Sequence, residues 1–318
     1  MITPPFLRKG DCVRLISPAG VINPDFVNGA EAFLASWGLN VLKGENVTKQ
    51  EGRFSGSVTQ RLFDLQEALD DTDCKAVFCS RGGYGAVHLI DKIRLESFRK
   101  RPKWLIGYSD ITMFHSLLQK EGYASIHGGM AKMLAAQMNP GQSKADSEPA
   151  SMLHNILWGN LPEYTTPTHP LNRNGQGSNL LRGGNLSILY SLRGTPYDYI
   201  PAKSILFIED IGEKPYVVDR MMHNLKFGGI LKNLSGLIVG QFTDYEEDSL
   251  FGKTVYEIIA DAVSEYSYPV CFNFPTGHIN QNLPLMIGSS VNLKVNEDGA
   301  KLNYIKKTPY LKKANKYE

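Results

Sequence analysis

Ser109 has a setting in the sequence that suits nucleophilic chemistry. It lies in the stretch WLIGYSDIT (104–112), just after an apolar run that predicts a strand and just before a segment that predicts a helix. A serine at such a turn can expose its hydroxyl to a substrate, as in the G-x-S-x-G nucleophile elbow, although Ile111 stands where the second glycine of that motif would be. A helix N-cap is the alternative, because serine commonly precedes helices.

A glycine-rich turn, SRGGYGA (80–86), follows another predicted strand, KAVFCS (75–80). Glycine permits positive φ angles and lets backbone N–H groups face a ligand with no Cβ in the way. The spacing matches neither the G-x-G-x-x-G fingerprint nor the P-loop. It predicts either a plain tight turn or a set of donors for an anion or an oxyanion.

Glu209 and His278 supply two further groups at predicted strand ends. Glu209 ends the apolar strand SILFIED (204–210), where it could orient a base, although a helix-capping acid is the alternative and Asp210 or Glu213 could have that role instead. His278 follows the strand YPVCFNF (268–274) within FPTGH, and an ordinary loop histidine is the alternative there.

Together these residues fill every role of acyl-transfer catalysis. A serine needs a neighbouring base to be nucleophilic near neutral pH, and a histidine base needs an acceptor that holds its tautomer. Backbone N–H groups must also face the developing oxyanion. Ser109, Glu209, His278 and the glycine turn therefore predict a serine hydrolase.

Metal chemistry has little support in the sequence. His88, His115, His127, His154, His169 and His223 are weaker candidates, and packing or surface roles are expected for His115 and His223, which fall inside predicted helices. HExxH and comparable ligand pairs are missing, and the four cysteines show no CxxC or CxxH spacing. We therefore expect no metal, no structural zinc and no disulfide framework, and a reducing cytoplasm as the location.

The elements that must position these residues alternate along the first half of the chain. Short apolar segments (13–17, 39–44, 75–80 and 104–108) predict strands, and residues 26–38 and 57–71 carry apolar side chains at helical spacing, with Ser57 or Thr59 as a cap. This order predicts a parallel sheet covered by helices, because parallel strands need crossover connections. Ligands of such sheets lie beyond the carboxyl ends of the strands.

The second half predicts a mixed α/β domain. Strands are expected over 204–210, 234–242 and 268–274, with helices over 185–194, 216–229 and 254–266, and the last pieces suit antiparallel pairing. The polar, turn-rich segment before them predicts a boundary, with one short helix at 151–159. We expect an N-terminal domain over 1–160, a crossover over 161–180 and a C-terminal domain over 181–318.

Composition is typical of a globular protein of two ordinary domains. The 318 residues are 42% hydrophobic and 21% charged, with a formal net charge of +2. This balance gives no reason to expect nucleic acid or an anionic membrane as a partner. The sequence begins without a signal-peptide pattern and contains no apolar run long enough to span a bilayer.

The chain resembles the LD-carboxypeptidase family, the muramoyltetrapeptide carboxypeptidases, over nearly its full length. The matching blocks are VRLISPAG, FSGSVTQRLFDLQEAL, KAVFCSRGGYGAVHLID, LIGYSDIT, LLRGGNLSIL, LFIEDIGEKPYVVDRMMHNL and FPTGH. The resemblance implies a flavodoxin- or Rossmann-like N-terminal domain that carries the nucleophile and a C-terminal domain that carries the acid and the base. It also implies a homodimer.

Through the same resemblance, Ser109 is the nucleophile and Glu209 and His278 complete a Ser-Glu-His triad. The backbone N–H groups of Asp110 and Gly83 are the implied oxyanion hole. The implied substrate is a cytoplasmic murein tetrapeptide, from which the enzyme removes terminal D-alanine at an L,D bond during cell-wall recycling. The implied chemistry needs no cofactor.

The residues that contact the substrate are predicted less directly than the triad and the oxyanion hole. An exopeptidase must recognise a free carboxylate, and the candidate clamps are Arg81 and Arg182; bracing of the turn through backbone carbonyls is the alternative, and it is favoured for Arg81. Motif position also nominates Gly82, Asn185 and Ser187 for the cleft. Tyr108 is expected to shape the elbow.

Three other functions compete with this interpretation. A related branch of the family hydrolyses aminoacyl-nucleotide analogues and confers immunity to microcin, but the extra aromatic sequence of that branch has no clear counterpart before RGGNL. A non-catalytic module could use RGGYG to bind an anion or a peptide. A nicotinamide dehydrogenase is disfavoured, because the glycine spacing is wrong and no acidic ribose partner follows.

Overall fold

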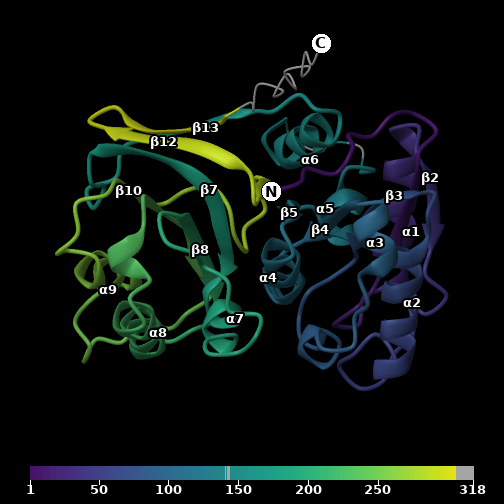
Figure 1. Cartoon of the computed structure of the whole chain (residues 1–318), viewed down its shortest axis with the longest axis horizontal. Coiled ribbons are helices and arrows are strands. Elements are labelled where there is room, and N and C mark those ends of the chain that lie inside the picture. The colour runs from purple at the N-terminus through teal and green to yellow at the C-terminus, as the bar shows by residue number, and fades with distance from the viewer. Residues whose placement is uncertain (140, 142–143, 306–318) are drawn as a thin grey trace, which may run out of the picture.

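Two sheets lie side by side in the computed structural model, which describes residues 1–139, 141 and 144–305 (Figure 1). The first has the strand order β11-β5-β4-β3-β1-β2, and the second has the order β10-β9-β8-β7-β12-β13-β6. The predicted α/β class, with parallel strands first and antiparallel strands near the C-terminus, is confirmed.

The first sheet and its helices come mainly from the N-terminal half of the chain. Their bounds are β1 Cys12–Ile16, α1 Pro24–Ser36, β2 Asn40–Lys43, α2 Val58–Asp70, β3 Cys74–Cys79, α3 Glu96–Lys100, β4 Trp104–Gly107, α4 Thr112–Lys120, β5 Ser125–His127, α5 Ala131–Ala136 and α6 Lys144–Leu157. Strands β1 to β5 pair in parallel, whereas β11 (Leu285–Ile287) crosses from the C-terminal half and pairs antiparallel with β5.

The second sheet joins a parallel part to an antiparallel part. Its elements are β6 Glu163–Thr166, β7 Gly175–Asn185, α7 Leu186–Ser191, β8 Ile205–Ile211, α8 Pro215–Phe227, β9 Gly236–Thr243, α9 Val255–Ala262, β10 Val270–Cys271, β12 Ser290–Asn296 and β13 Gly299–Tyr304. Strands β7 to β10 pair in parallel, and β7, β12, β13 and β6 pair antiparallel. Glu209 therefore lies near the carboxyl end of β8, in the parallel part.

Local sequence signals account for the helix ends. Ser57 and Gln60 form a capping box that starts α2, each side chain bonding the other residue's backbone N–H. Gly38, which has a φ of 82°, follows the C-cap residue Trp37 of α1, a position where glycine adopts the left-handed conformation without a steric penalty.

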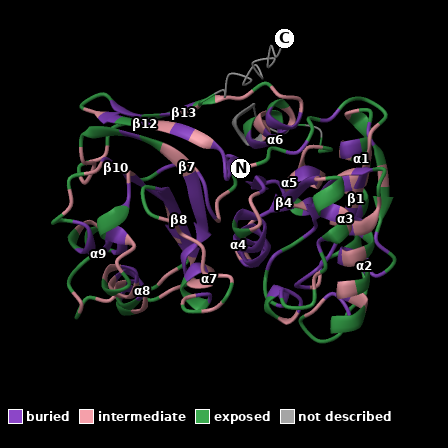
Figure 2. Ribbon diagram, in the orientation of Figure 1, coloured by how far each residue is buried: buried purple, intermediate pink, exposed green. Residues whose placement is uncertain are grey.

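Apolar side chains pack on both faces of the first sheet, and its strand β4 is buried throughout (Figure 2). One core cluster includes Val13, Phe78 and Ile106, and the cluster on the other face includes Val77 and Leu105. Because successive side chains of a strand point to opposite faces, this alternation requires helices on both sides of the sheet.

Three elements differ from the prediction. β10 spans two residues rather than the predicted seven, and the backbone at Asn273 has a left-handed φ of 58°, which is incompatible with an extended strand there. β7 begins at Gly175, within a segment predicted to be a crossover, and α6 is longer than the predicted helix at 151–159. The domain boundaries at 160 and 180 remain predictions.

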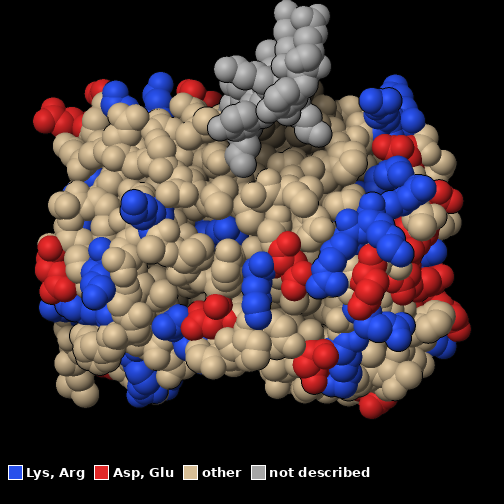
Figure 3. Space-filling view, viewed as in Figure 1, with Lys and Arg blue, Asp and Glu red and all other residues tan. Residues whose placement is uncertain are grey.

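Both signs of charge are interspersed on the face of the molecule in Figure 3, in agreement with the small net charge. Within the described ranges, none of the helices is both long and apolar enough to cross a membrane.

Candidate active site

Ser109 lies at a strained turn directly after β4. Its φ is 63°, a left-handed value that is uncommon for a residue other than glycine. Tyr108, not Ser109, occupies the N-cap position of the 3-10 turn Ser109–Ile111, and Ser109 Oγ makes no hydrogen bond to a described residue. The structure therefore favours the elbow over the helix cap, because strained backbone of this kind clusters at functional sites.

The glycine turn packs directly against this elbow. A methyl group placed on Gly82 would lie 2.8 Å from Ser109 Cβ and 3.0 Å from the Tyr108 carbonyl oxygen. Gly83 has a φ of 85°, and Gly20 N–H donates to the Gly82 carbonyl over 2.8 Å. The close approach explains why glycine is needed at position 82, and it places the turn where backbone N–H groups could face a substrate at Ser109.

The Asp110 side chain ties the glycine turn to the elbow. Its Oδ2 accepts a hydrogen bond of 2.8 Å from Ala86 N–H, and the residue is only 1% exposed. Burial raises the pKa of Asp110 to about 6, against the lowering effects of the Ala86 N–H and the Arg61 guanidinium. Arg61 is itself buried and donates to the carbonyls of Pro18, Gly85 and Gly56.

The supporting roles of the Asp110 side chain and of Arg61 were not predicted from the sequence. For Arg61, however, its position in the helix gives a signal. Arg61 precedes Leu65 by four residues, so it lies on the apolar face of α2, where a charged side chain must find partners. The side chain of Asp110 had no comparable signal, because a carboxylate next to a helix start is common.

Glu209 and His278 form a hydrogen-bonded pair, in which Glu209 is buried and His278 is partly exposed. His278 Nδ1 lies 2.8 Å from Glu209 Oε2, and Glu209 is 0% exposed. Burial alone would lower the pKa of His278, but the hydrogen bond and charge of Glu209, with Asp210 and Asp244, raise it above its ordinary value. A carboxylate at Nδ1 fixes the tautomer, so that Nε2 carries the free lone pair.

Tyr108 joins the two halves of the site. Its ring centroid lies 5.1 Å from that of His278, at an interplanar angle of 66°. Burial, with the charge of Glu209, raises the pKa of Tyr108 to about 12, so the phenol stays neutral near pH 7. The structure thus brings the glycine turn against Ser109 and the Glu209–His278 pair against Tyr108, the residue before Ser109, although the chain separates these segments widely.

Two buried histidines lie behind the elbow. His115 bonds the Gly107 carbonyl through Nε2 and Ser125 Oγ through Nδ1, each over 2.8 Å, and burial lowers its pKa to about 4. His127 is 0% exposed, its ring lies 5.8 Å from Tyr108, and neither of its nitrogens has a partner among the described residues. Burial keeps both rings neutral, and His115 braces the strand that leads to Ser109.

Asn185 and Ser187 contact Asp210 rather than open space. Asn185 Nδ2 donates to Asp210 Oδ1 over 2.9 Å, and its own Oδ1 caps α7 by accepting from Ile188 N–H. Ser187 N–H donates to Asp210 Oδ2 over 2.8 Å. Burial and the charge of Glu209 raise the pKa of Asp210 to about 7. We assign Asn185 and Ser187 to the support of the strand end that carries Glu209.

Arg182 does not fit the predicted role of a substrate clamp. It is 1% exposed, its Nη1 donates to Gln119 Oε1 over 3.2 Å, and its guanidinium lies 5.0 Å from the Tyr199 ring centroid. A substrate carboxylate could not reach it without opening the packing between β7 and α4. Arg81, in contrast, is exposed, and its Nη1 donates to the Val21 carbonyl over 2.6 Å, which is the predicted bracing bond.

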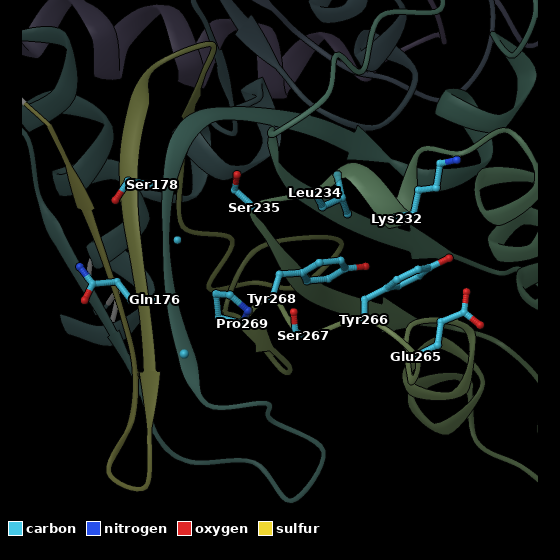
Figure 4. A pocket seen from close by; sticks show the side chains of 12 residues that line it. Gln176, Ser178, Lys232, Leu234, Ser235, Glu265, Tyr266, Ser267, Tyr268 and Pro269 are labelled. Carbon is cyan, nitrogen blue, oxygen red and sulfur yellow. The ribbon is translucent and has the colours of Figure 1, made fainter.

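A separate pocket of about 650 Å³ lies at the other end of the second sheet (Figure 4). Its lining includes Ser178, Ser235, Tyr266 and Tyr268, which come from residues around the starts of β7, β9 and β10. Because Glu209 lies near the opposite end of β8, this pocket is not the candidate active site. Within the described ranges, no group of three or more potential metal ligands is present.

Comparison with known proteins identifies the family. Residues 13–128 match the model of the LD-carboxypeptidase N-terminal domain, and residues 178–293 match that of the C-terminal domain. The chain belongs to the LD-carboxypeptidase family. The predicted family, and with it the prediction of a peptidase, is confirmed.

Relatives and solved structures agree with this membership. A probable murein peptide carboxypeptidase of Bacillus subtilis is 33% identical over 93% of each chain. The murein tetrapeptide carboxypeptidase of Pseudomonas aeruginosa is 31% identical over 89% of this chain and 93% of its own. The muramoyltetrapeptide carboxypeptidase of Oxalobacter formigenes superposes with a TM-score of 0.81 at 27% identity, covering 93% of this chain and 99% of its own.

The microcin C7 self-immunity protein MccF shares the fold. Its wild-type apo structure has a TM-score of 0.83 at 19% identity and covers 96% of this chain and 99% of its own. Identity at that level shows the common fold alone.

Proposed function

We propose that this protein is a serine carboxypeptidase that releases terminal D-alanine from murein tetrapeptides through a Ser109-Glu209-His278 triad. The observation that carries the proposal is the hydrogen bond between buried Glu209 and His278, whose imidazole contacts Tyr108, the residue before a strained Ser109. The names of the two relatives and the O. formigenes structure support a murein peptide as substrate.

The proposed reaction begins when Ser109 Oγ attacks the carbonyl of the L,D bond before D-alanine. His278 Nε2 accepts the hydroxyl proton while Nδ1–H donates to Glu209, which stabilises the imidazolium. The negative charge on the carbonyl oxygen is stabilised by the N–H groups of Asp110 and Gly83. Each such donor is typically worth about 2.7–4 kcal/mol.

The tetrahedral intermediate then collapses. The C–N bond breaks, His278 gives its proton to the D-alanine amine, and an acyl ester on Ser109 remains. Water, deprotonated by His278, attacks the ester, and the shortened peptide leaves as Ser109 regains its proton. In this proposed course, each step uses only water and residues of this chain.

Cell-wall recycling in the cytoplasm and a homodimer belong to the same proposal. They rest on the resemblance described above.

Mass spectrometry tests the substrate directly. The protein is incubated with a murein tetrapeptide that ends in D-alanine, with diaminopimelate or lysine before it, and in parallel with an aminoacyl sulfamoyl adenosine. Loss of a single alanine from the tetrapeptide supports the proposal. Hydrolysis of the nucleotide analogue alone would favour the microcin-immunity activity instead.

A further inference from the structure

Arg81 lies beside the glycine turn in a fixed position. Its Nη1 is held by the Val21 carbonyl at 2.6 Å. A methyl group placed on Gly83 would lie 3.8 Å from Arg81 Nε, and one placed on Gly20 would lie 3.7 Å from Arg81 Cδ. The guanidinium is therefore oriented next to the residue that we propose as an oxyanion donor.

Toward the part of the chain that the structure describes, most of the hydrogen-bonding capacity of Arg81 is unused. A guanidinium has five N–H donors, and the bond to Val21 uses one of them. Within the described ranges, Arg81 makes no ion pair with an acidic side chain. Arg61, in contrast, is buried and donates hydrogen bonds to three backbone carbonyls. Arg61 thus uses its donors to brace the loops, whereas Arg81 braces them through one bond and is otherwise exposed.

The chemistry of an exopeptidase supplies a matching acceptor. In a peptide cleaved before its last residue, the free carboxylate is one residue beyond the scissile carbonyl, with the two carbon atoms roughly 3–4 Å apart. A guanidinium that borders an oxyanion donor, as Arg81 borders Gly83, is therefore a candidate partner for that carboxylate. A planar guanidinium also fits a carboxylate better than an ammonium, because it can donate two parallel hydrogen bonds.

We propose that Arg81 binds the free α-carboxylate of the terminal D-amino acid and so makes the enzyme an exopeptidase. This inference rests on the proposed function, since it concerns the leaving group of that reaction. One hydrogen bond to Val21 positions the guanidinium, and the remaining donors recognise the substrate.

The experiment compares two substrates, the tetrapeptide with a free terminal carboxylate and the same peptide as its terminal carboxamide. kcat/KM is measured for wild type, Arg81→Met and Arg81→Lys. The control is Arg53→Met, because Arg53 is also exposed near this turn but places its guanidinium over the Tyr84 ring, at 5.9 Å. Labelling by an uncharged serine-reactive probe, which has no carboxylate, reports whether the elbow and glycine turn remain intact.

We expect wild type and Arg53→Met to prefer the acid over the amide by about 10- to 100-fold. Arg81→Met loses this preference through slower cleavage of the acid, while amide cleavage and probe labelling stay close to wild type. Arg81→Lys can still bond Val21 but lacks the planar fork, so it retains only part of the preference.

Two results would overturn the inference. One is a wild-type enzyme that cleaves acid and amide equally well. The other is an Arg81→Met variant that loses acid cleavage, amide cleavage and labelling in parallel, which would make Arg81 a structural brace. Failure of wild type to release alanine from either peptide would instead contradict the proposed function.

Discussion

Gly82→Ala gives a steric test of the arrangement of the elbow and the glycine turn. Gly82 is outside the left-handed region of φ, so alanine adds no backbone strain and acts only through its methyl group. That group would lie 2.8 Å from Ser109 Cβ, 3.1 Å from Ser109 Oγ and 3.0 Å from the Tyr108 carbonyl oxygen. Non-bonded carbon atoms prefer about 3.5–4.0 Å, so the elbow and the turn must separate by several tenths of an ångström.

The expected result is a large loss of activity with a moderate loss of stability. Overpacking of this kind costs about 1–3 kcal/mol of unfolding free energy. A displacement of catalytic groups by about 1 Å can lower the rate by roughly 100-fold. We therefore expect kcat for D-alanine release to fall by about 100-fold, together with the rate of labelling by a serine-reactive probe.

Gly52→Ala is the matched control. Gly52 has a φ of 59° and no heavy atom within 4 Å of an added methyl group. Alanine there costs about 1–2 kcal/mol of backbone strain without touching the site. It should lower the thermal unfolding temperature about as much as Gly82→Ala and keep wild-type kcat. Full activity in Gly82→Ala would refute the proposed contact between the glycine turn and the nucleophile.

Two further substitutions test the acid and the buried arginine. Catalysis needs neutral His278, so kcat/KM falls as the pH falls through the pKa of this histidine. Glu209 raises that pKa, so Glu209→Gln should move the acid limb of the pH profile to lower pH and cut the maximal rate by roughly 10³–10⁴-fold. An unmoved limb would exclude Glu209 as the partner of the base. Arg182→Met should leave KM for the tetrapeptide unchanged, since Arg182 is buried between β7 and α4. A marked rise in KM with an unaltered unfolding temperature would contradict this and indicate that Arg182 binds the substrate.

Local pattern predicted most elements of the parallel sheets. The apolar runs at β1, β3, β4 and β8 and the helical spacing in α1, α2 and α8 were sufficient, because each signal lies within a short stretch of chain. The same reasoning located Ser109, Glu209 and His278 at strand ends. It could not measure their separation, which depends on which strands are neighbours.

Strand β7 was missed for a physical reason. Its glycines weaken the strand pattern in the sequence, but they are needed because other backbone segments approach closely. A methyl group on Gly177 would lie 1.9 Å from the Ser235 carbonyl oxygen, and one on Gly183 would lie 1.8 Å from the Phe207 carbonyl oxygen. The pairing of β11 with β5 depends on residues far apart in sequence, and no local pattern reports it.

The roles of Arg182 and Asp210 also depend on tertiary packing. Arg182 looked like a free cation in a glycine-rich motif, whereas its strand buries it. Asp210 looked like a cap for the following helix, whereas its carboxylate accepts from Ser187 N–H at the start of α7. Sequence spacing cannot distinguish the expected role of each side chain from the observed one, because both roles give the side chain hydrogen-bond partners.

Covalent labelling of Ser109 tests the central claim most directly. Wild type and Ser109→Ala are treated with a serine-reactive probe and analysed by mass spectrometry, and both are assayed for D-alanine release. We predict one adduct on the peptide that contains Ser109 in wild type, and neither adduct nor release in Ser109→Ala. Equal labelling of Ser109→Ala, or release of D-alanine at the wild-type rate, would contradict the assignment of Ser109 as the nucleophile.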